Sequence, residues 1–138
     1  MTRAFSLAGL LRVRSVQERE AAQRLSRAAV EARQTAARDR QLRAALGGGE
    51  TDALDGRSLA ALAASRAAGR ALLADLSALG ALQQQTEQTA RAEHHERRRE
   101  VRGLEKLAEA HARAVRADEL RSEQAELDEI AGRMTGEA

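Results

Sequence analysis

The sequence predicts an all-α protein, a long two-helix antiparallel coiled-coil hairpin with an extended C-terminal helix. The 138 residues include 32 alanines and 22 arginines but one phenylalanine and no tryptophan, tyrosine, proline or cysteine. Valine, isoleucine and threonine, which favour strands, number only 5, 1 and 6. One aromatic ring supplies little core area, and the absence of proline lets helices run unbroken. The whole chain therefore reads as a single coiled-coil unit.

The first helix is expected over about residues 5–46, where apolar and small residues recur with heptad spacing. Such spacing is typical of a helix that buries one narrow face, here called the seam, against a partner helix. Alanine in the seam lets the two helices lie close but buries little area, so this helix needs its partner for stability. The two heptad rows are Ala4, Leu11, Glu18, Leu25, Ala32, Asp39 and Leu46, and Leu7, Arg14, Ala21, Ala28, Thr35 and Leu42.

The turn is expected over residues 47–57, which hold four of the ten glycines and two aspartates. Glycine commonly ends a helix, whereas aspartate and serine accept hydrogen bonds from the first free backbone N–H groups of the next one. Asp55 or Ser58 is therefore the expected N-cap of the second helix. Gly47–Gly49 is interpreted as loop, because a phosphate-binding loop requires a following Lys-Ser or Lys-Thr pair.

The second helix is expected over about residues 58–131, a length of ~110 Å at 1.5 Å per residue. Gly80 and Gly103 weaken it by about 1 kcal/mol each relative to alanine without forcing a break. A three-helix arrangement, broken near Gly80, is the alternative. In the two-helix model the C-terminal residues extend beyond the first helix as an arm. The expected seam is Leu59, Leu62, Gly69, Leu73, Leu76, Gly80, Gln83, Ala90, Val101, Leu104, Ala108, His111 and Val115.

The charges favour neither nucleic acid nor membrane as a partner. The net charge is +2, and the sequence pI of about 10.2 reflects arginine in place of lysine. Residues 1–50 carry ten arginines against five acids, and residues 91–138 carry ten bases against twelve acids. The run Arg97–Arg99 lies among glutamates, which is typical of a solvated helix face with i,i+4 ion pairs. We expect a cytoplasmic chain without a membrane span or signal peptide.

We expect no enzyme, cofactor or metal site. A two-helix coiled coil offers no concave pocket that excludes water or shifts the pKa of a catalytic group. The closest pattern to a metal site is His94-His95 between Glu93 and Glu96. Adjacent helical side chains point about 100° apart, so the two imidazoles cannot bind one ion together.

Two groups of leucines suggest contact surfaces. Near the turn, Leu72, Leu79 and Leu82 fall beside the expected seam, so they either broaden the local packing or form a docking surface. In the C-terminal arm, Leu120, Leu127 and Met134 recur at spacing seven, and Ile130 follows Leu127 by three. If the arm has no partner within the chain, this stripe should bind another protein.

Two stretches at the ends of the chain form a recognisable pair. The opening stretch is Phe5, Leu7, Leu10, Leu11, Val13 and Arg14, followed by Gln17-Glu18, Ala21-Ala22 and Leu25. The closing stretch is Leu104-Glu105-Lys106-Leu107, then Glu123-Gln124 and Leu127-Asp128-Glu129-Ile130-Ala131. Together they resemble the FliJ family of the flagellar type III export apparatus. Family members often carry aromatic residues near the turn, where this chain has leucine, alanine and glycine.

The resemblance implies a stalk that binds the hexameric export ATPase, promotes its assembly and activity, links it to the cytoplasmic region of the export gate and contacts export chaperones. It implies a cytoplasmic location at the inner face of the membrane at the flagellar base. The implied ATPase-binding residues are Leu10, Leu11, Arg14, Leu120, Leu127, Asp128 and Ile130. The implied gate-binding residues are Leu42, Gly69, Leu72 and Leu76. The alternative function is a homodimeric coiled-coil scaffold or adaptor with no ATPase partner; a nucleic-acid-associated helical protein is a third possibility.

Overall fold

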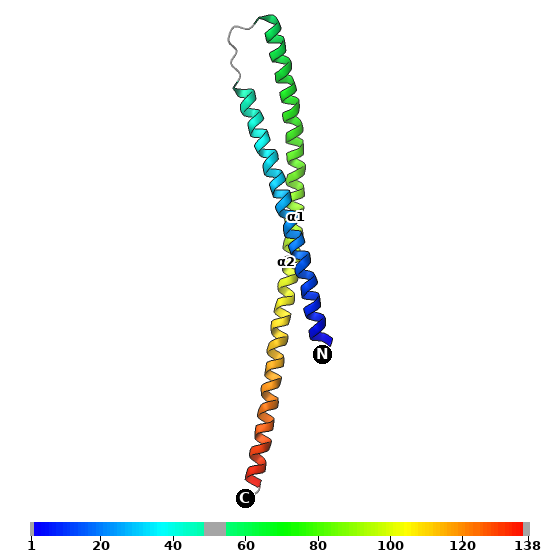
Figure 1. Ribbon diagram of the computed structural model, residues 1–138, viewed down its shortest axis with the longest axis vertical. Helices are drawn as coiled ribbons and strands as arrows, with labels where there is room; N and C mark the ends of the chain where they lie inside the picture. Colours follow the sequence, from blue (N-terminus) through cyan, green and yellow to red (C-terminus); the bar gives the residue numbers. More distant parts are fainter. Residues whose placement is uncertain (1, 49–54, 137–138) are drawn as a thin grey trace. The chain divides into compact units, whose positions relative to one another are not determined.

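Two long helices make up the computed structural model, which describes residues 2–48 and 55–136, with side chains from residue 6 onward. Helix α1 (Thr2–Gly47) is followed by helix α2 (Gly56–Gly136), and the described residues contain no strand. The helices pack against each other in opposite directions, which confirms the predicted two-helix hairpin (Figure 1). Both helices extend slightly beyond the expected ranges of 5–46 and 58–131. Within the expected turn, residues 49–54 lie outside the described part.

Asp55 begins the second helix. Its Oδ1 atom accepts a hydrogen bond of 2.8 Å from the backbone N–H of Ser58, and its carbonyl accepts one of 3.0 Å from Leu59. These are the contacts of an N-cap, so of the two expected caps the chain uses Asp55. The hydrogen bonds from Ser58 stabilise the charged carboxylate and lower the pKa of Asp55 below its ordinary value.

Helix α2 runs without interruption through Gly80 and Gly103. The three-helix alternative is therefore not the observed fold. A glycine costs a helix only about 1 kcal/mol relative to alanine, which the contacts along a long helix offset. The two helices are not abnormally close at Gly80, because a Cβ added there would lie 3.8 Å from Thr35 Cγ2, an ordinary van der Waals contact.

The chain forms two compact units, and the larger one comprises residues 19–96. Three contacts set its antiparallel register: Leu46 lies over Gly69, Thr35 lies beside Gly80, and Arg24 pairs with Glu93. Every expected seam position of α1 in this unit, from Ala21 to Leu46, is buried or half-buried. The two heptad rows of α1 are thus confirmed here, polar members included.

The core of this unit is thin. Ala21 is 1% exposed, Thr35 4%, Ala28 7% and Ala90 8%, and no large side chain is fully buried among the described residues. Small seam residues allow the two backbones to approach closely, but each contributes little apolar area at about 25 cal/mol per Å². The stability of the pair must therefore come from many weak layers along its length.

The α2 seam contains polar residues that the sequence pattern did not indicate. Half-buried or buried positions alternate at spacings of four and three, which is a regular heptad. Arg66, Glu87, His94 and Arg97 occupy four of these positions, since long side chains bury their stems while their polar ends reach water. The seam positions are Leu62, Arg66, Gly69, Leu73, Leu76, Gly80, Gln83, Glu87, Ala90 and His94, with Arg97, Val101, Leu104 and Ala108 in the second unit; Ser58, Glu93 and Glu100 are half-buried beside this row.

The expected α2 seam was wrong at both ends. Leu59 is 51% exposed, and His111 and Val115 are exposed as well. The register explains both errors, because α1 ends at Gly47 and begins at Thr2. Neither Leu59 nor Val115 has a residue of α1 opposite it.

The second unit comprises residues 1–18 and 97–138. Here the α1 seam positions Leu7, Leu11, Arg14 and Glu18 are half-buried, as expected, whereas Ala4 lies outside the described side chains. On α2, burial ends at Ala108: every residue from 109 to 136 is exposed. We call residues 109–136 the arm.

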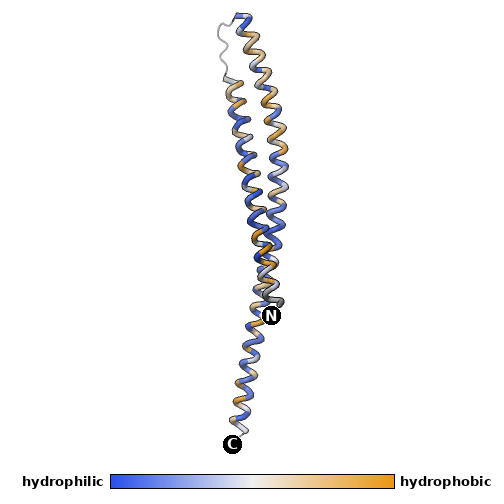
Figure 2. The backbone as a smooth tube through the Cα atoms, turned by 45° about the vertical axis from the view of Figure 1, so that its right-hand side comes forward, coloured by the Kyte–Doolittle hydropathy of each residue, from blue (hydrophilic) through white to orange (hydrophobic). Residues whose placement is uncertain are grey.

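Hydrophilic and hydrophobic residues alternate along both helices (Figure 2). In the described residues, no helical stretch is long and apolar enough to cross a membrane.

Candidate protein-binding surfaces

The arm carries large apolar side chains that the chain does not cover. Leu120 is 65% exposed, Leu127 60%, Ile130 53% and Met134 74%. The most buried of the described side chains are alanines and one threonine, whereas these exposed residues are leucine, isoleucine and methionine. Exposed apolar stripes of this kind typically mark sites of protein interaction.

The apolar stripe of the arm lies on a different face of α2 from the seam. Continuing the seam heptad beyond Ala108 leads to Asp118, Ala125 and Gly132. Leu120, Leu127 and Met134 each follow one of these positions by two residues. At about 100° per residue, two residues rotate a side chain well away from the seam direction. A partner helix bound to the stripe would therefore lie on a different face of α2 from the one that packs against α1.

Several polar side chains of the arm pair with one another along the helix. Arg133 pairs with Glu129 at 2.6 Å, and Arg121 pairs with Asp118 at 2.5 Å. Gln124 donates a hydrogen bond of 3.0 Å to Asp128. Such i,i+3 and i,i+4 pairs help an unaccompanied helix to persist, each by ~0.2–0.5 kcal/mol. The arm thus holds its helical form without covering its leucines.

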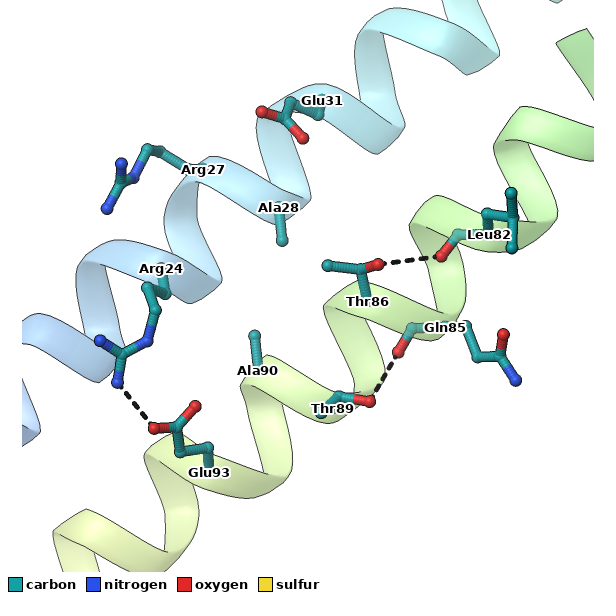
Figure 3. A pocket seen from close by; sticks show the side chains of 10 residues that line it. All are labelled: Arg24, Arg27, Ala28, Glu31, Leu82, Gln85, Thr86, Thr89, Ala90 and Glu93. Atoms are coloured by element: carbon teal, nitrogen blue, oxygen red, sulfur yellow. Dashed lines mark hydrogen bonds and ion pairs between the residues drawn. The ribbon is translucent and has the colours of Figure 1, made fainter.

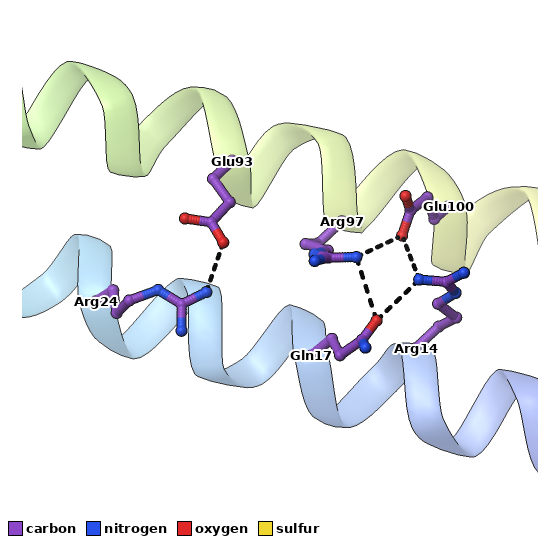
Figure 4. Close-up of polar contacts among 6 residues, drawn as sticks. All are labelled: Arg14, Gln17, Arg24, Glu93, Arg97 and Glu100. Atoms are coloured by element: carbon purple, nitrogen blue, oxygen red, sulfur yellow. Dashed lines mark hydrogen bonds and ion pairs between the residues drawn. The ribbon is translucent and has the colours of Figure 1, made fainter.

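A polar network joins the helices within the unit of residues 1–18 and 97–138 (Figure 4). Arg14 Nη1 donates to Gln17 Oε1 at 3.0 Å, and Arg97 Nη1 donates to the same oxygen at 3.2 Å. Glu100 Oε2 lies 3.3 Å from Arg97 Nη1 and 3.6 Å from Arg14 Nη1. These side chains are about one-third exposed, so the ion pairs stabilise little. Polar groups within a seam act mainly to fix its register.

A small apolar groove lies next to this network. Leu10, Leu104 and Leu107 line it, together with Gly103, Arg14, Arg99 and Glu100, around a volume of about 370 Å³. Leu10 is 43% exposed and Leu107 59%. Gly103 leaves open space beside the leucines, because a Cβ there would meet no atom within 4 Å. The groove offers apolar area in the same unit as the arm.

A second groove lies in the unit of residues 19–96 (Figure 3). Ala28 and Ala90 face each other at its floor, and their small size leaves an open volume of about 930 Å³. Arg24 pairs with Glu93 across it at 2.7 Å, and Leu82, 62% exposed, lies along its wall. Thr86 and Thr89 turn their hydroxyls back to the α2 carbonyls of Leu82 and Gln85. Arg27, Glu31 and Gln85 complete the lining, so the groove presents methyl groups together with charged and amide side chains.

All the residues implied as ATPase-binding fall in the unit of residues 1–18 and 97–138. Leu10 is exposed, whereas Leu11 and Arg14 are half-buried in the seam. Asp128 is exposed on the arm and accepts the hydrogen bond from Gln124. With Leu120, Leu127 and Ile130, five of these positions are accessible to a partner.

The residues implied as gate-binding fall in the unit of residues 19–96. Only Leu72, 52% exposed, is open to a partner. Leu42, Gly69 and Leu76 are half-buried seam positions, and a Cβ on Gly69 would come within 2.6 Å of Leu46 Cδ2. Leu59, Leu79 and Leu82 are exposed with Leu72. Their side chains, rather than those of the seam, form the available apolar surface.

Sequence reasoning missed the groove formed by Leu10, Leu104 and Leu107. The signal was present as leucine on both helices beside a glycine, but its recognition requires the register between the helices. The two adjacent histidines differ in burial: His94 is half-buried in the seam and His95 is exposed, with ring centroids 6.3 Å apart. The described residues contain no group of three or more metal-ligating side chains.

No protein-family model, curated protein or solved structure matches this chain.

Proposed function

We propose that this protein is a non-enzymatic coiled-coil stalk of a flagellar type III export apparatus, which binds the export ATPase through its exposed arm. The observation that supports this proposal is the uncovered stripe of Leu120, Leu127, Ile130 and Met134 on a helix that also carries intrahelical ion pairs. The resemblance of both chain ends to the FliJ family supplies the identity of the partner.

In this proposal the arm and the first turns of α1 bind the ATPase hexamer. Leu10 and the groove beside Leu107 add apolar area to that of the arm. A helix seated between subunits of a ring would favour closure of some interfaces over others, because binding energy that differs between two conformations shifts their populations. The leucines near the turn would contact the export gate, and export chaperones would be further partners. The protein would then act in the cytoplasm at the inner face of the membrane.

The test uses the full chain and the purified export ATPase of the same cell. The protein should increase the fraction of ATPase hexamer, measured by native mass spectrometry, and raise the rate of ATP hydrolysis. The same preparation with Leu120→Asp serves as a control that keeps the fold but disrupts the stripe. Unchanged assembly and hydrolysis with the unmodified protein would refute the proposal.

The second candidate function is a homodimeric scaffold. It is favoured by the same stripe, since two arms could cover one another's leucines without any other protein. The two functions differ in the mass of the isolated protein. A tight dimer through residues 109–136, which does not open on addition of the ATPase, would support the scaffold.

A further inference from the structure

On one side of the unit of residues 19–96, the positions that flank the seam include arginines but no acidic residue. We call it the arginine face. It consists of the side chains that flank the seam on the side of Arg33 and Ala36 in α1 and of Ser77 and Ala81 in α2. Nearly all of them are exposed. Its arginines are Arg19, Arg33, Arg40, Arg43, Arg70 and Arg91, and its small residues include Ala22, Ser26, Ala29, Ala36, Ala67, Ala74, Ser77 and Ala81.

A groove of about 650 Å³ runs along the arginine face. Arg33, Ala36 and Arg40 of α1 form one wall, and Ser77, Ala81 and Gln84 of α2 form the other. The floor includes Thr35, 4% exposed, and Gly80, where the helices lie close. Small residues on the walls and floor leave space for side chains of another helix to enter.

The arginines of the arginine face outnumber the acids that reach its groove. Two seam carboxylates reach it, but Asp39 pairs with Arg43 at 2.7 Å and Glu87 pairs with Arg91 at 2.8 Å. Arg40 makes no ion pair among the described residues. Arg70, which precedes Ser77 by seven residues, makes none either. The acids outside the seam, such as Glu20, Glu31, Asp75 and Glu93, lie on the other side of the helix pair.

The arm has the complementary chemistry. Residues 118–130 hold six acids and a single arginine around the exposed Leu120, Leu127 and Ile130. Glu119, Glu123 and Glu126 form a row beside the leucines. Glu119 and Glu126 are seven residues apart, as are Arg33 and Arg40, so each pair spans ~10.5 Å along its helix. The acidic row and the basic wall can therefore meet in register.

We propose that the arm of one molecule docks on the arginine face of a second molecule. Leu120 and Leu127 enter the groove of small residues, and Glu119, Glu123 and Glu126 face Arg33, Arg40 and Arg70. The small-residue floor suits apolar side chains better than phosphates, and the described residues offer no Phe, Tyr or Trp side chain on which a base could stack. Because the contact joins two different surfaces, either two molecules each dock an arm on the other, or the same contact repeats from one molecule to the next in an open chain.

The test measures the mass of the full-length protein by sedimentation velocity over a range of concentrations. We expect association at low salt that disappears near 1 M salt, where charges are screened within ~3 Å. The double variant Arg40→Glu/Arg70→Glu should weaken association by about tenfold or more, because two attractions become repulsions. Glu123→Arg/Glu126→Arg should do the same from the other side. The matched control Arg27→Glu/Arg38→Glu, on the opposite side of the helix pair, should leave association unchanged.

Mixing the two charge-reversed variants provides the decisive measurement. The variants Arg40→Glu/Arg70→Glu and Glu123→Arg/Glu126→Arg, each weakened alone, should associate with each other when combined. A protein that stays monomeric at all concentrations, or a mixture that does not associate, would overturn the proposal.

Salt-independent association that resists Arg40→Glu/Arg70→Glu would instead indicate contact between two arms. Binding of duplex DNA or RNA by a protein that stays monomeric would assign the arginine face to nucleic acid. Because Arg40→Glu/Arg70→Glu leaves the arm intact, this variant should still stimulate the export ATPase, which separates this proposal from the preceding one.

Discussion

The paired helices of residues 19–96 and the arm use their apolar residues in opposite ways. In the paired region the most buried side chains are Ala21, Ala28, Thr35 and Ala90, which permit close contact but bury little area. In the arm, Leu120, Leu127 and Met134 are more than half exposed. Large apolar side chains that take no part in folding indicate recognition, whereas small ones that are buried indicate a structural requirement. Substitutions in the two regions should therefore affect different measurements.

The largest effect should come from the arm. Replacing Leu127 and Ile130 together by aspartate puts two charges into the stripe and should abolish binding of its partner. Central apolar contacts typically contribute about 2 kcal/mol each, or roughly 30-fold in affinity. Helicity by circular dichroism and the midpoint of thermal unfolding should change little, because both side chains are exposed. Affinity for the export ATPase is the measurement.

The matched control places the same two charges on another face of the arm. Ser122→Asp with Ala125→Asp alters positions that continue the seam heptad, away from the stripe, and should leave binding intact. If Leu127→Asp/Ile130→Asp instead lowered thermal stability with binding unchanged, the leucine stripe would belong to the fold, and the contrast between the two regions would be wrong.

The next largest effect should come from overfilling the seam. Ala21 is 1% exposed, so Ala21→Leu forces the helices apart and should lower the free energy of unfolding by about 1–3 kcal/mol. The same substitution at Ala117, exposed on the arm, should be nearly neutral. Chemical denaturation of both variants gives the comparison. Equal destabilisation by both would show that the arm is packed like the seam.

The sequence predicted the α1 seam position by position but not the full α2 seam. In α1, even the polar Arg14, Glu18 and Asp39 fell on the heptad rows, because alanine and leucine on either side defined the phase. In α2, the predicted seam included Gln83 and His111 but omitted Glu87 and His94, because it did not keep a regular spacing. A strict spacing of four and three from Leu73 onward would have found them.

The candidate surfaces depended on information that a linear pattern lacks. The arm and its stripe were predicted, because leucine at spacing seven is visible without a partner. Predicting that Leu42 and Leu76 lie in the seam while Leu72 is exposed requires knowledge of how α2 is rotated relative to α1. The arginine face likewise emerges only when Arg33 and Arg40 of α1 are set beside Ser77 and Ala81 of α2. Composition showed many arginines but could not show on which side of the seam the acids lie.

A smaller effect should distinguish two glycines of the seam. Gly80→Ala should raise the free energy of unfolding by about 0.5–1 kcal/mol, since alanine is the better helix former and its Cβ would meet Thr35 Cγ2 at 3.8 Å. Gly69→Ala should gain less, because its Cβ would lie 2.6 Å from Leu46 Cδ2 and the leucine would have to move. Thermal unfolding of both variants ranks them. A larger gain from Gly69→Ala would mean that Leu46 does not pack over α2 as described.

The smallest effect concerns the cap of α2 and depends on pH. Hydrogen bonds from Ser58 lower the pKa of Asp55 in the folded protein, so the charged carboxylate contributes stability above the pKa of the unfolded chain. That contribution is lost as the pH falls through the lowered folded pKa. Asp55→Asn keeps a capping oxygen without the titration, so its thermal midpoint should lie below that of the unmodified protein at neutral pH and approach it in acid. Asp55→Ala, which removes the cap, should remain less stable than Asp55→Asn at every pH. A gap between the unmodified protein and Asp55→Asn that stays constant from neutral to acid pH would show that the charge of Asp55 plays no part in starting the helix.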